Sequence, residues 1–203
     1  MAVVVVGGQS RNLGKTSVVA GLIEALPAYA WTAFKITQFG HGRCSLDGKV
    51  CHCATSDHCY SITEEKVASG GTDTARFLLA GAKRAFWVRT EQGRLAEALP
   101  AIRRRLAEAE NAILESNSIV HFIRPDLYLS VLDPGMEDFK NSARALLGRA
   151  DAVILHRSRL AVSPEVASET GRPRFFIQPP PYLTAEIIAF VAQHLEKLPL
   201  RGA

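Results

Sequence analysis

The sequence predicts an α/β fold in which a mostly parallel, doubly wound sheet lies between two layers of helices. Short runs of β-branched residues alternate with longer amphipathic segments along the chain, and this alternation is typical of parallel sheets wrapped by helices. The chain has 203 residues, of which 47% are hydrophobic and 22% charged. That length and composition suit one domain with a sizeable core, covering residues 1–203.

The first elements follow from local residue patterns. Val3–Val6 is a run of β-branched residues and predicts a buried strand. Lys15–Leu26 predicts a helix, because its apolar residues recur on one face and Pro27 ends it. Trp31–Ile36 predicts the second strand. Residues 38–71 are poor in periodic apolar residues and predict a long irregular insertion, and loops of this length are usually functional or ligand-stabilised.

The later elements continue the alternation. Thr72–Ala82 predicts a helix with Thr72 or Asp73 as its N-cap. Ala85–Arg89 predicts the third strand, and Arg94–Glu110 predicts a long helix in which Pro100 is a candidate break. The remaining strands are expected at Ala112–Glu115, Leu127–Leu132, Ala152–Leu155 and Arg174–Ile177. The remaining helices are expected at Asn117–Phe122, Phe139–Arg149 and Thr184–Leu198.

A glycine-rich loop joins the first strand to the first helix and ends in Gly-Lys-Thr. In such a loop, successive backbone N–H groups and the helix N-terminus bind phosphate oxygens. The Lys15 ammonium would reach the β- and γ-phosphates, and the Thr16 hydroxyl would hold Mg²⁺. The spacing is Gly-x5-Gly-Lys-Thr, one residue longer than the usual P-loop. The candidate nucleotide-binding residues are Gly8, Gln9, Ser10, Arg11, Asn12, Leu13, Gly14, Lys15, Thr16 and Ser17.

Three charged residues near predicted element ends join Lys15 as candidate catalytic residues. Glu115 ends a central strand, where a carboxylate holds Mg²⁺ directly or through water, or forms a helix cap or salt bridge. Lys35 ends the second strand and would lie near the phosphates or a second substrate, or be solvated. Asp73 would orient water or a metal, or cap its helix, and the cap is favoured. Asp133, before Pro-Gly, is expected to be a turn residue.

All four cysteines of the chain fall in the predicted long loop, together with three histidines. A tetrahedral site of four thiolates would order such a loop, with Zn²⁺ as the default metal and an iron–sulfur cluster as the second choice. The alternative is a flexible loop with adventitious thiols or a disulfide. The candidate ligands are Cys44, Cys51, Cys53 and Cys59.

Charge and hydropathy narrow the class of partner. The net charge is +4, which is compatible with phosphate ligands. No aromatic RNA-binding motif or DNA-reading helix stands out, so a nucleic-acid partner is not expected. No stretch approaches the ~20 apolar residues of a membrane span, and no secretory leader is evident, so the sequence predicts a cytoplasmic protein that does not enter a membrane.

Two segments resemble the molybdopterin-guanine dinucleotide biosynthesis protein B family. Phe34-Lys35-Ile36-Thr37 places a lysine at the end of the second strand, as that family does, and residues 71–82 resemble its next helix. The wider signal-recognition, MinD and BioD class has a three-layer P-loop NTPase-like fold, and the longer glycine loop resembles its member dethiobiotin synthetase. The positions that match the first family's helix are Asp73, Thr74, Arg76, Ala80, Gly81 and Ala82.

The resemblance implies binding of GTP or ATP with Mg²⁺, weak hydrolysis, and a role as an adaptor in molybdenum-cofactor biosynthesis with a partner protein or as a homodimer. The expected guanine-reading Asn-Lys-x-Asp is absent at residues 156–159, so the base stays open. Three other functions fit the residues: a metal-delivery NTPase that carries its cargo on the cysteine loop, an ATP-dependent ligase or kinase like dethiobiotin synthetase, and a non-catalytic zinc-stabilised binding module.

Overall fold

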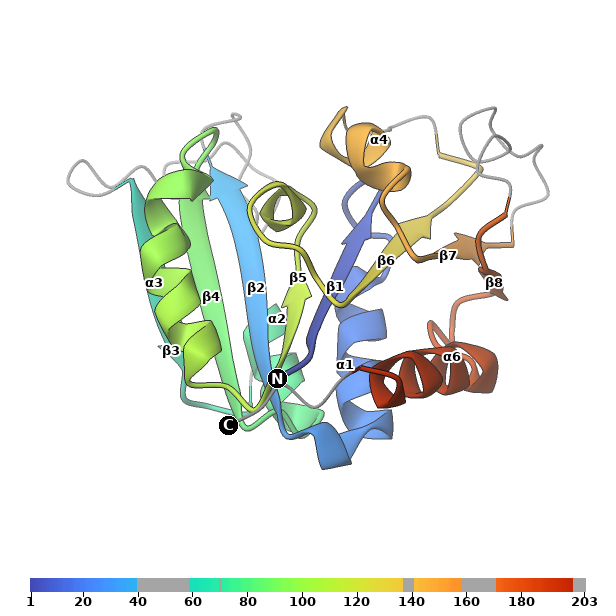
Figure 1. Ribbon diagram of the computed structural model, residues 1–203, viewed down its shortest axis with the longest axis horizontal. Helices are drawn as coiled ribbons and strands as arrows, with labels where there is room; N and C mark the ends of the chain where they lie inside the picture. The colour runs from blue at the N-terminus through green and yellow to red at the C-terminus, as the bar shows by residue number, and fades with distance from the viewer. Residues whose placement is uncertain (40–58, 70, 137–140, 158–170, 199–203) are drawn as a thin grey trace.

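The computed structural model describes residues 1–39, 59–69, 71–136, 141–157 and 171–198. These residues form an eight-stranded sheet in the order β3-β4-β2-β5-β1-β6-β7-β8 (Figure 1). Every pairing is parallel except that of β3 with β4, which is antiparallel. The strands are β1 Val3–Gly8, β2 Trp31–Phe39, β3 Tyr60–Glu65, β4 Arg84–Glu91, β5 Asn111–Glu115, β6 Leu127–Leu132, β7 Ala152–His156 and β8 Arg174–Ile177.

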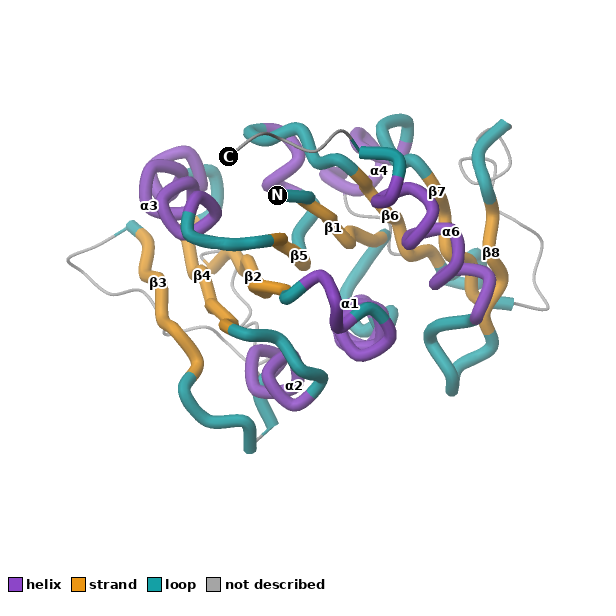
Figure 2. The backbone as a smooth tube through the Cα atoms, turned by 60° about the horizontal axis from the view of Figure 1, so that its bottom comes forward, coloured by secondary structure: helices purple, strands orange, loops and turns teal. Residues whose placement is uncertain are grey.

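Helices cover both faces of the sheet, which gives the three layers seen in Figure 2. Helices α1, α2 and α6 pack on one face, and α3, α4 and the short 3-10 helix η2 pack on the other. The helices are α1 Lys15–Ala25, α2 Asp73–Leu79, α3 Leu95–Ala107, α4 Asn141–Leu147 and α6 Ala185–Glu196, with 3-10 turns η1 Pro27–Tyr29 and η2 Ser118–His121. Among the residues that the structure describes, no helix is both long and apolar enough to span a bilayer.

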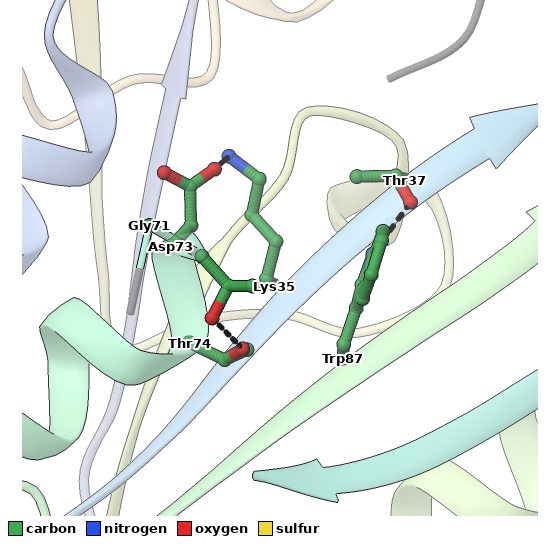
Figure 3. A pocket seen from close by; sticks show the side chains of 7 residues that line it. Lys35, Thr37, Gly71, Asp73, Thr74 and Trp87 are labelled. Carbon is green, nitrogen blue, oxygen red and sulfur yellow. Dashed lines mark hydrogen bonds and ion pairs between the residues drawn. The ribbon is translucent and has the colours of Figure 1, made fainter. Parts of the chain in front are cut away.

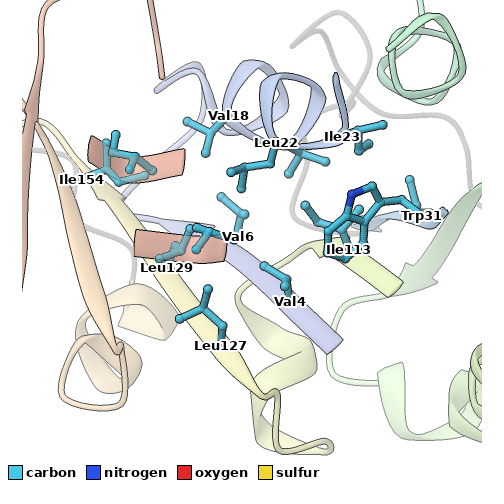
Figure 4. Packing of buried hydrophobic residues seen from close by; sticks show 14 of the residues in the cluster. Val4, Val6, Val18, Leu22, Ile23, Trp31, Ile113, Leu127, Leu129 and Ile154 are labelled. Carbon is cyan, nitrogen blue, oxygen red and sulfur yellow. The ribbon is translucent and has the colours of Figure 1, made fainter. Parts of the chain in front are cut away.

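Strand β1 lies in the middle of the sheet and is buried on both faces, which explains its unbroken run of valines. Because side chains alternate along a strand, Val4 and Val6 face α1, whereas Val3 and Val5 join the core beneath α3. Figure 4 shows Val4 and Val6 packed against Val18 and Leu22 of α1. This packing fixes the end of β1, and with it the start of the glycine loop, against the first helix.

The sequence predicted an irregular insertion over residues 38–71, and the structure shows strands in parts of it. Strand β2 continues to Phe39 instead of ending at Ile36, and residues 60–65 form β3 along the edge of the sheet. No residue of β3 is fully buried, and the strand shows little of the apolar alternation by which strands are detected from sequence. Residues 40–58 of the insertion lie outside the described residues.

The candidate helix break at Pro100 was wrong, because α3 continues through this exposed position.

Candidate functional site

The glycine loop closes tightly between β1 and α1. Asn12 and Gly14 both take left-handed backbone angles, with φ of 59° and 80°, and Gly14 is the N-cap residue of α1. The side chain of Leu13 is buried in the core beside α1, and Gln9 is also buried. Two hydrogen bonds tie Gln9 to the loop after β6: its Nε2 donates to the carbonyl of Met136 (2.7 Å), and its Oε1 accepts from the amide of Asp133 (3.0 Å). The side chains of Gln9 and Leu13 therefore hold the loop in place from inside the protein.

Asn117, which the sequence did not single out, clamps the peptide at the start of the loop. The amide of Gly8 donates to Asn117 Oδ1 (2.7 Å), and Asn117 Nδ2 donates to the carbonyl of Gly8 (2.8 Å). The residue lies two positions after Glu115, the last residue of β5, so its position just past a strand end was the signal that could have identified it. The clamp holds the direction of the chain as it leaves β1.

The other side of the loop is covered by residues from the C-terminal part of the chain. His156 at the end of β7 donates from Nε2 to the carbonyl of Leu13 (3.0 Å). Its ring contacts Tyr182 edge-on, with centroids 6.1 Å apart. A Cβ atom on Gly14 would lie 2.0 Å from two carbons of the Tyr182 ring. The glycine therefore meets two demands at once, a left-handed backbone and close contact with an aromatic ring.

These two demands can be separated by comparing Gly14 with Gly93. Gly93 has nearly the same φ, 83°, but a Cβ atom added there would meet no other atom within 4 Å. We expect Gly93→Ala to lower the free energy of unfolding by about 1 kcal/mol, from backbone strain alone. Gly14→Ala should cost about 2–4 kcal/mol, because the clash adds to the strain. Urea denaturation of both variants measures the difference, and equal losses would show that Tyr182 does not constrain the loop.

Lys15 begins α1, and its ammonium donates to the carbonyl of Ser10 across the loop. Thr16, the next residue, is nearly buried, and its hydroxyl donates to Glu115 Oε2 over 2.7 Å. The sequence predicted both residues for the phosphates and the metal. The structure brings Thr16 together with Glu115, which lies 99 residues further along the chain.

Lys35 joins the nearly buried Thr16 and Glu115 in one cluster with Asp73, whose side chain is partly exposed. Lys35 and Glu115 are register partners on the neighbouring strands β2 and β5, and the Lys35 Nζ lies 2.5 Å from Glu115 Oε1. The same ammonium lies 2.7 Å from Asp73 Oδ2 and 3.3 Å from Thr16 Oγ1. Burial lowers the pKa of Lys35, but the charges of Glu115 and Asp73 outweigh it, so its net pKa shift is upward. Lys35 therefore stays charged at neutral pH.

This cluster suits a small divalent cation. Two carboxylates and a hydroxyl converge within 3.3 Å of one positive charge, that of the Lys35 ammonium. Hard oxygen donors of these types are the ligands that Mg²⁺ prefers. Thr16 and Glu115 are both nearly buried, so the donor set is held in place by the fold.

The structure corrects the interpretation of Asp73. The N-cap of α2 is Thr72, whose hydroxyl accepts from the amide of Ala75 over 3.1 Å. Asp73 is the first residue of the helix and instead pairs with Lys35. The expectation for Asp133 agrees with the structure, because its Oδ1 accepts from the amide of Gly135 (2.9 Å) within a turn.

A pocket of about 100 Å³ adjoins the cluster (Figure 3). It is lined by Lys35 and Thr37 from β2, by Trp87 from β4, and by residues 71–74 at the start of α2. In Figure 3 the indole of Trp87 lies on one side, and Lys35 and Asp73 lie on the other. The sequence did not identify Trp87, because its proximity to Lys35 depends on the pairing of β2 with β4.

The missed strand β3 positions one wall of this pocket. Glu65, the last residue of β3, accepts hydrogen bonds at Oε2 from the hydroxyls of Thr72 (3.0 Å) and Thr74 (3.1 Å). The pKa of Glu65 is lowered by hydrogen bonds, of which the one from the amide of Val67 has the largest effect. Burial raises the pKa, but by less than the hydrogen bonds together lower it. The edge strand thereby anchors the segment that carries Asp73.

The predicted thiolate site falls largely outside the described residues, where Cys44, Cys51 and Cys53 lie. Cys59 is described: its thiol donates to Glu97 Oε2 over 2.6 Å, and this hydrogen bond chiefly raises the pKa of the thiol. Within the described ranges, no group of three or more His, Cys, Asp or Glu side chains could hold a metal ion. The four-thiolate site stays a prediction.

Comparison with known proteins links the chain to solved structures by fold. No protein-family model and no curated protein matches it. HypB from Helicobacter pylori in complex with nickel is 13% identical, with a TM-score of 0.50 over 98% of this chain and 90% of that chain. LpxK from Aquifex aeolicus in complex with ATP is 21% identical, with a TM-score of 0.48 over 87% of this chain. This chain spans about half of LpxK, 53% of its length.

At these identities the likeness concerns the fold. The three-layer arrangement and the mostly parallel sheet are those of P-loop NTPases, as the sequence predicted. The prediction of this fold class is confirmed.

Proposed function

We propose that the chain binds a nucleoside triphosphate, GTP or ATP, together with Mg²⁺, and that it hydrolyses the nucleotide slowly or transfers its terminal phosphoryl group. The observation that carries the proposal is the hydrogen bond from Thr16 to Glu115 directly behind Lys15. It joins the end of the glycine loop to a buried carboxylate at the carboxyl end of a central strand. Ligands of doubly wound sheets bind at this edge.

The chain's own residues would act by positioning and charge. The first amides of α1 have no acceptor within the helix and would donate to the phosphate oxygens. Lys15 would exchange the carbonyl of Ser10 for the β- and γ-phosphates. Lys35, held charged beside Glu115, would lie near the bound phosphates or a second substrate and stabilise negative charge there. The hydrogen bond from the amide of Gly8 to Asn117 would keep the Gly8 peptide oriented while the loop binds the phosphates.

Thr16, Glu115 and Asp73 would hold Mg²⁺, directly or through water. The ion supplies charge stabilisation on the phosphate oxygens when it is bound. The Lys35 ammonium pairs with the same two carboxylates.

Two finer roles follow from different features. The resemblance in residues 71–82 supports an adaptor in molybdenum-cofactor guanine-dinucleotide biosynthesis, which would act in the cytoplasm with a partner protein or as a homodimer. The pocket beside Lys35 favours a second candidate, a ligase or kinase that transfers the phosphoryl group to a small acceptor. Acceptor-dependent turnover distinguishes the two, because an adaptor needs no small acceptor.

Calorimetric titration with ATP and with GTP, each with Mg²⁺ and with EDTA, tests the proposed function. We expect about one triphosphate to bind per chain, with at least about tenfold lower affinity in EDTA, because the bound cation offsets the charge of Glu115 and Asp73 next to the phosphates. Absence of binding for both nucleotides would overturn the proposal.

A further inference from the structure

The pocket between Trp87 and the cation cluster carries chemistry that nucleotide binding does not use. Lys35, Trp87 and Thr63 lie side by side across β2, β4 and β3, since each is a register partner of the next. The residues two positions earlier on β2 and β4, Ala33 and Ala85, are buried in the core on the face that α1 and α2 cover. The same face of the sheet therefore changes from core to pocket where its strands approach their carboxyl ends.

Trp87 presents an aromatic surface rather than a hydrogen-bond donor. Its indole Nε1 already donates to Thr37 Oγ1 over 2.9 Å. The guanidinium of Arg89 lies 4.8 Å from its ring centroid, and Arg89 is not among the described residues that line the pocket. A flat ligand ring that stacks on this indole would add an aromatic contact without breaking a hydrogen bond.

Opposite the indole, the pocket holds a charge that can change partners. Lys35 is about 16% exposed and lies between the carboxylates of Asp73 and Glu115. When a divalent cation takes those carboxylates, the ammonium loses its counter-charges inside a largely buried site. An unpaired buried charge is costly, so a new anion beside Lys35 would be favoured.

From this arrangement we infer that the pocket binds a second ligand beside the nucleotide: a small, flat ring that carries a carboxylate or phosphate group. The ring lies on Trp87, the anionic group pairs with Lys35, and a volume of about 100 Å³ suits a small ligand. The inference rests on the proposed function, because bound Mg²⁺ and nucleotide are what release Lys35. It specifies the acceptor class of the ligase or kinase candidate.

The test uses three probes that differ in one property each. Benzoate has a flat ring and a charge, benzamide has the ring without the charge, and cyclohexanecarboxylate has the charge without a flat ring. Each is titrated into ¹⁵N-labelled protein with Mg²⁺ and a non-hydrolysable triphosphate. The readout is the indole N–H resonance of Trp87, and that of Trp31 is an internal control, because Trp31 is buried and donates to the carbonyl of Leu26.

We expect benzoate to shift the Trp87 resonance and leave Trp31 unchanged, with about tenfold weaker binding of the other two probes and of benzoate without nucleotide. Lys35→Met should abolish the response. Phe176→Leu, an aromatic change on the exposed side of β8 at the opposite edge of the sheet, should keep it.

The outcomes separate the two claims. If the nucleotide binds but Trp87 responds to no probe, or responds equally to all three, the inference about the pocket is wrong and the proposed function stands. If the nucleotide itself does not bind, the proposed function fails and the inference fails with it. The comparison of probes is made on the unmodified protein, so it does not depend on the folding of a variant.

Discussion

Lys15→Ala is expected to weaken triphosphate binding by about a hundredfold, or about 2.7 kcal/mol. A hydrogen bond to a charged group contributes about 1.5–3 kcal/mol, and Lys15 would donate to both the β- and γ-phosphates. Binding of the monophosphate should change little, because it lacks those groups. Calorimetric titration of the variant with the triphosphate and the monophosphate of the same base measures both effects.

Lys83→Ala is the matched control for this prediction. Lys83 is an exposed lysine that pairs with Glu110 over 2.6 Å at the surface. Its loss removes the same charge from the protein without touching the loop, so triphosphate affinity should be unchanged. If both variants bind as the unmodified protein does, the glycine loop does not hold the nucleotide through Lys15.

Glu115→Gln is expected to remove most of the dependence of nucleotide affinity on Mg²⁺. The amide keeps the size of the side chain and an oxygen that accepts from Thr16, but it loses the charge that attracts the cation. We expect the tenfold or greater gain on adding Mg²⁺ to fall to about twofold, a loss of about 1 kcal/mol or more. Titration of nucleotide at a series of Mg²⁺ concentrations gives the value.

Glu110→Gln provides the comparison, because Glu110 is about 65% exposed and lies away from the loop. Its Mg²⁺ dependence should match that of the unmodified protein. A Glu115→Gln variant with full Mg²⁺ dependence would show that Glu115 serves only as a salt-bridge partner of Lys35.

The sequence allowed most of the fold to be predicted, because central parallel strands are buried on both faces and appear as short apolar runs. Strands β6 and β8 begin and end at the predicted residues. Strand β3 was missed for the opposite reason: it lies at an edge, is partly exposed, and contains more polar than apolar positions. The low helix propensity of proline also suggested a break at Pro100, but α3 tolerates this residue at an exposed position.

The part of the candidate site that could be predicted consists of residues near the carboxyl ends of neighbouring parallel strands, because these ends meet at one edge of the sheet. Lys35 and Glu115 were both predicted near strand ends, and they form the last register pair of β2 and β5, so their contact follows once these strands are neighbours. His156 and Trp87 could not be assigned in this way, because their roles depend on which strands pair and on how the loops cross the sheet edge. The cap role favoured for Asp73 was wrong, because Thr72 beside it, the other cap residue that the sequence offered, is the N-cap.

The central claim is that residues 8–17 form a loop whose backbone amides hold the phosphates of a nucleotide. The most direct measurement is the change in amide resonances of ¹⁵N-labelled protein on adding Mg²⁺ with ATP or GTP. We expect the largest shifts on Gly8 to Ser17, together with the amides next to Lys35 and Glu115, and we expect them to disappear in Lys15→Ala. Shifts confined to other parts of the chain, or none with either nucleotide, would contradict the central claim.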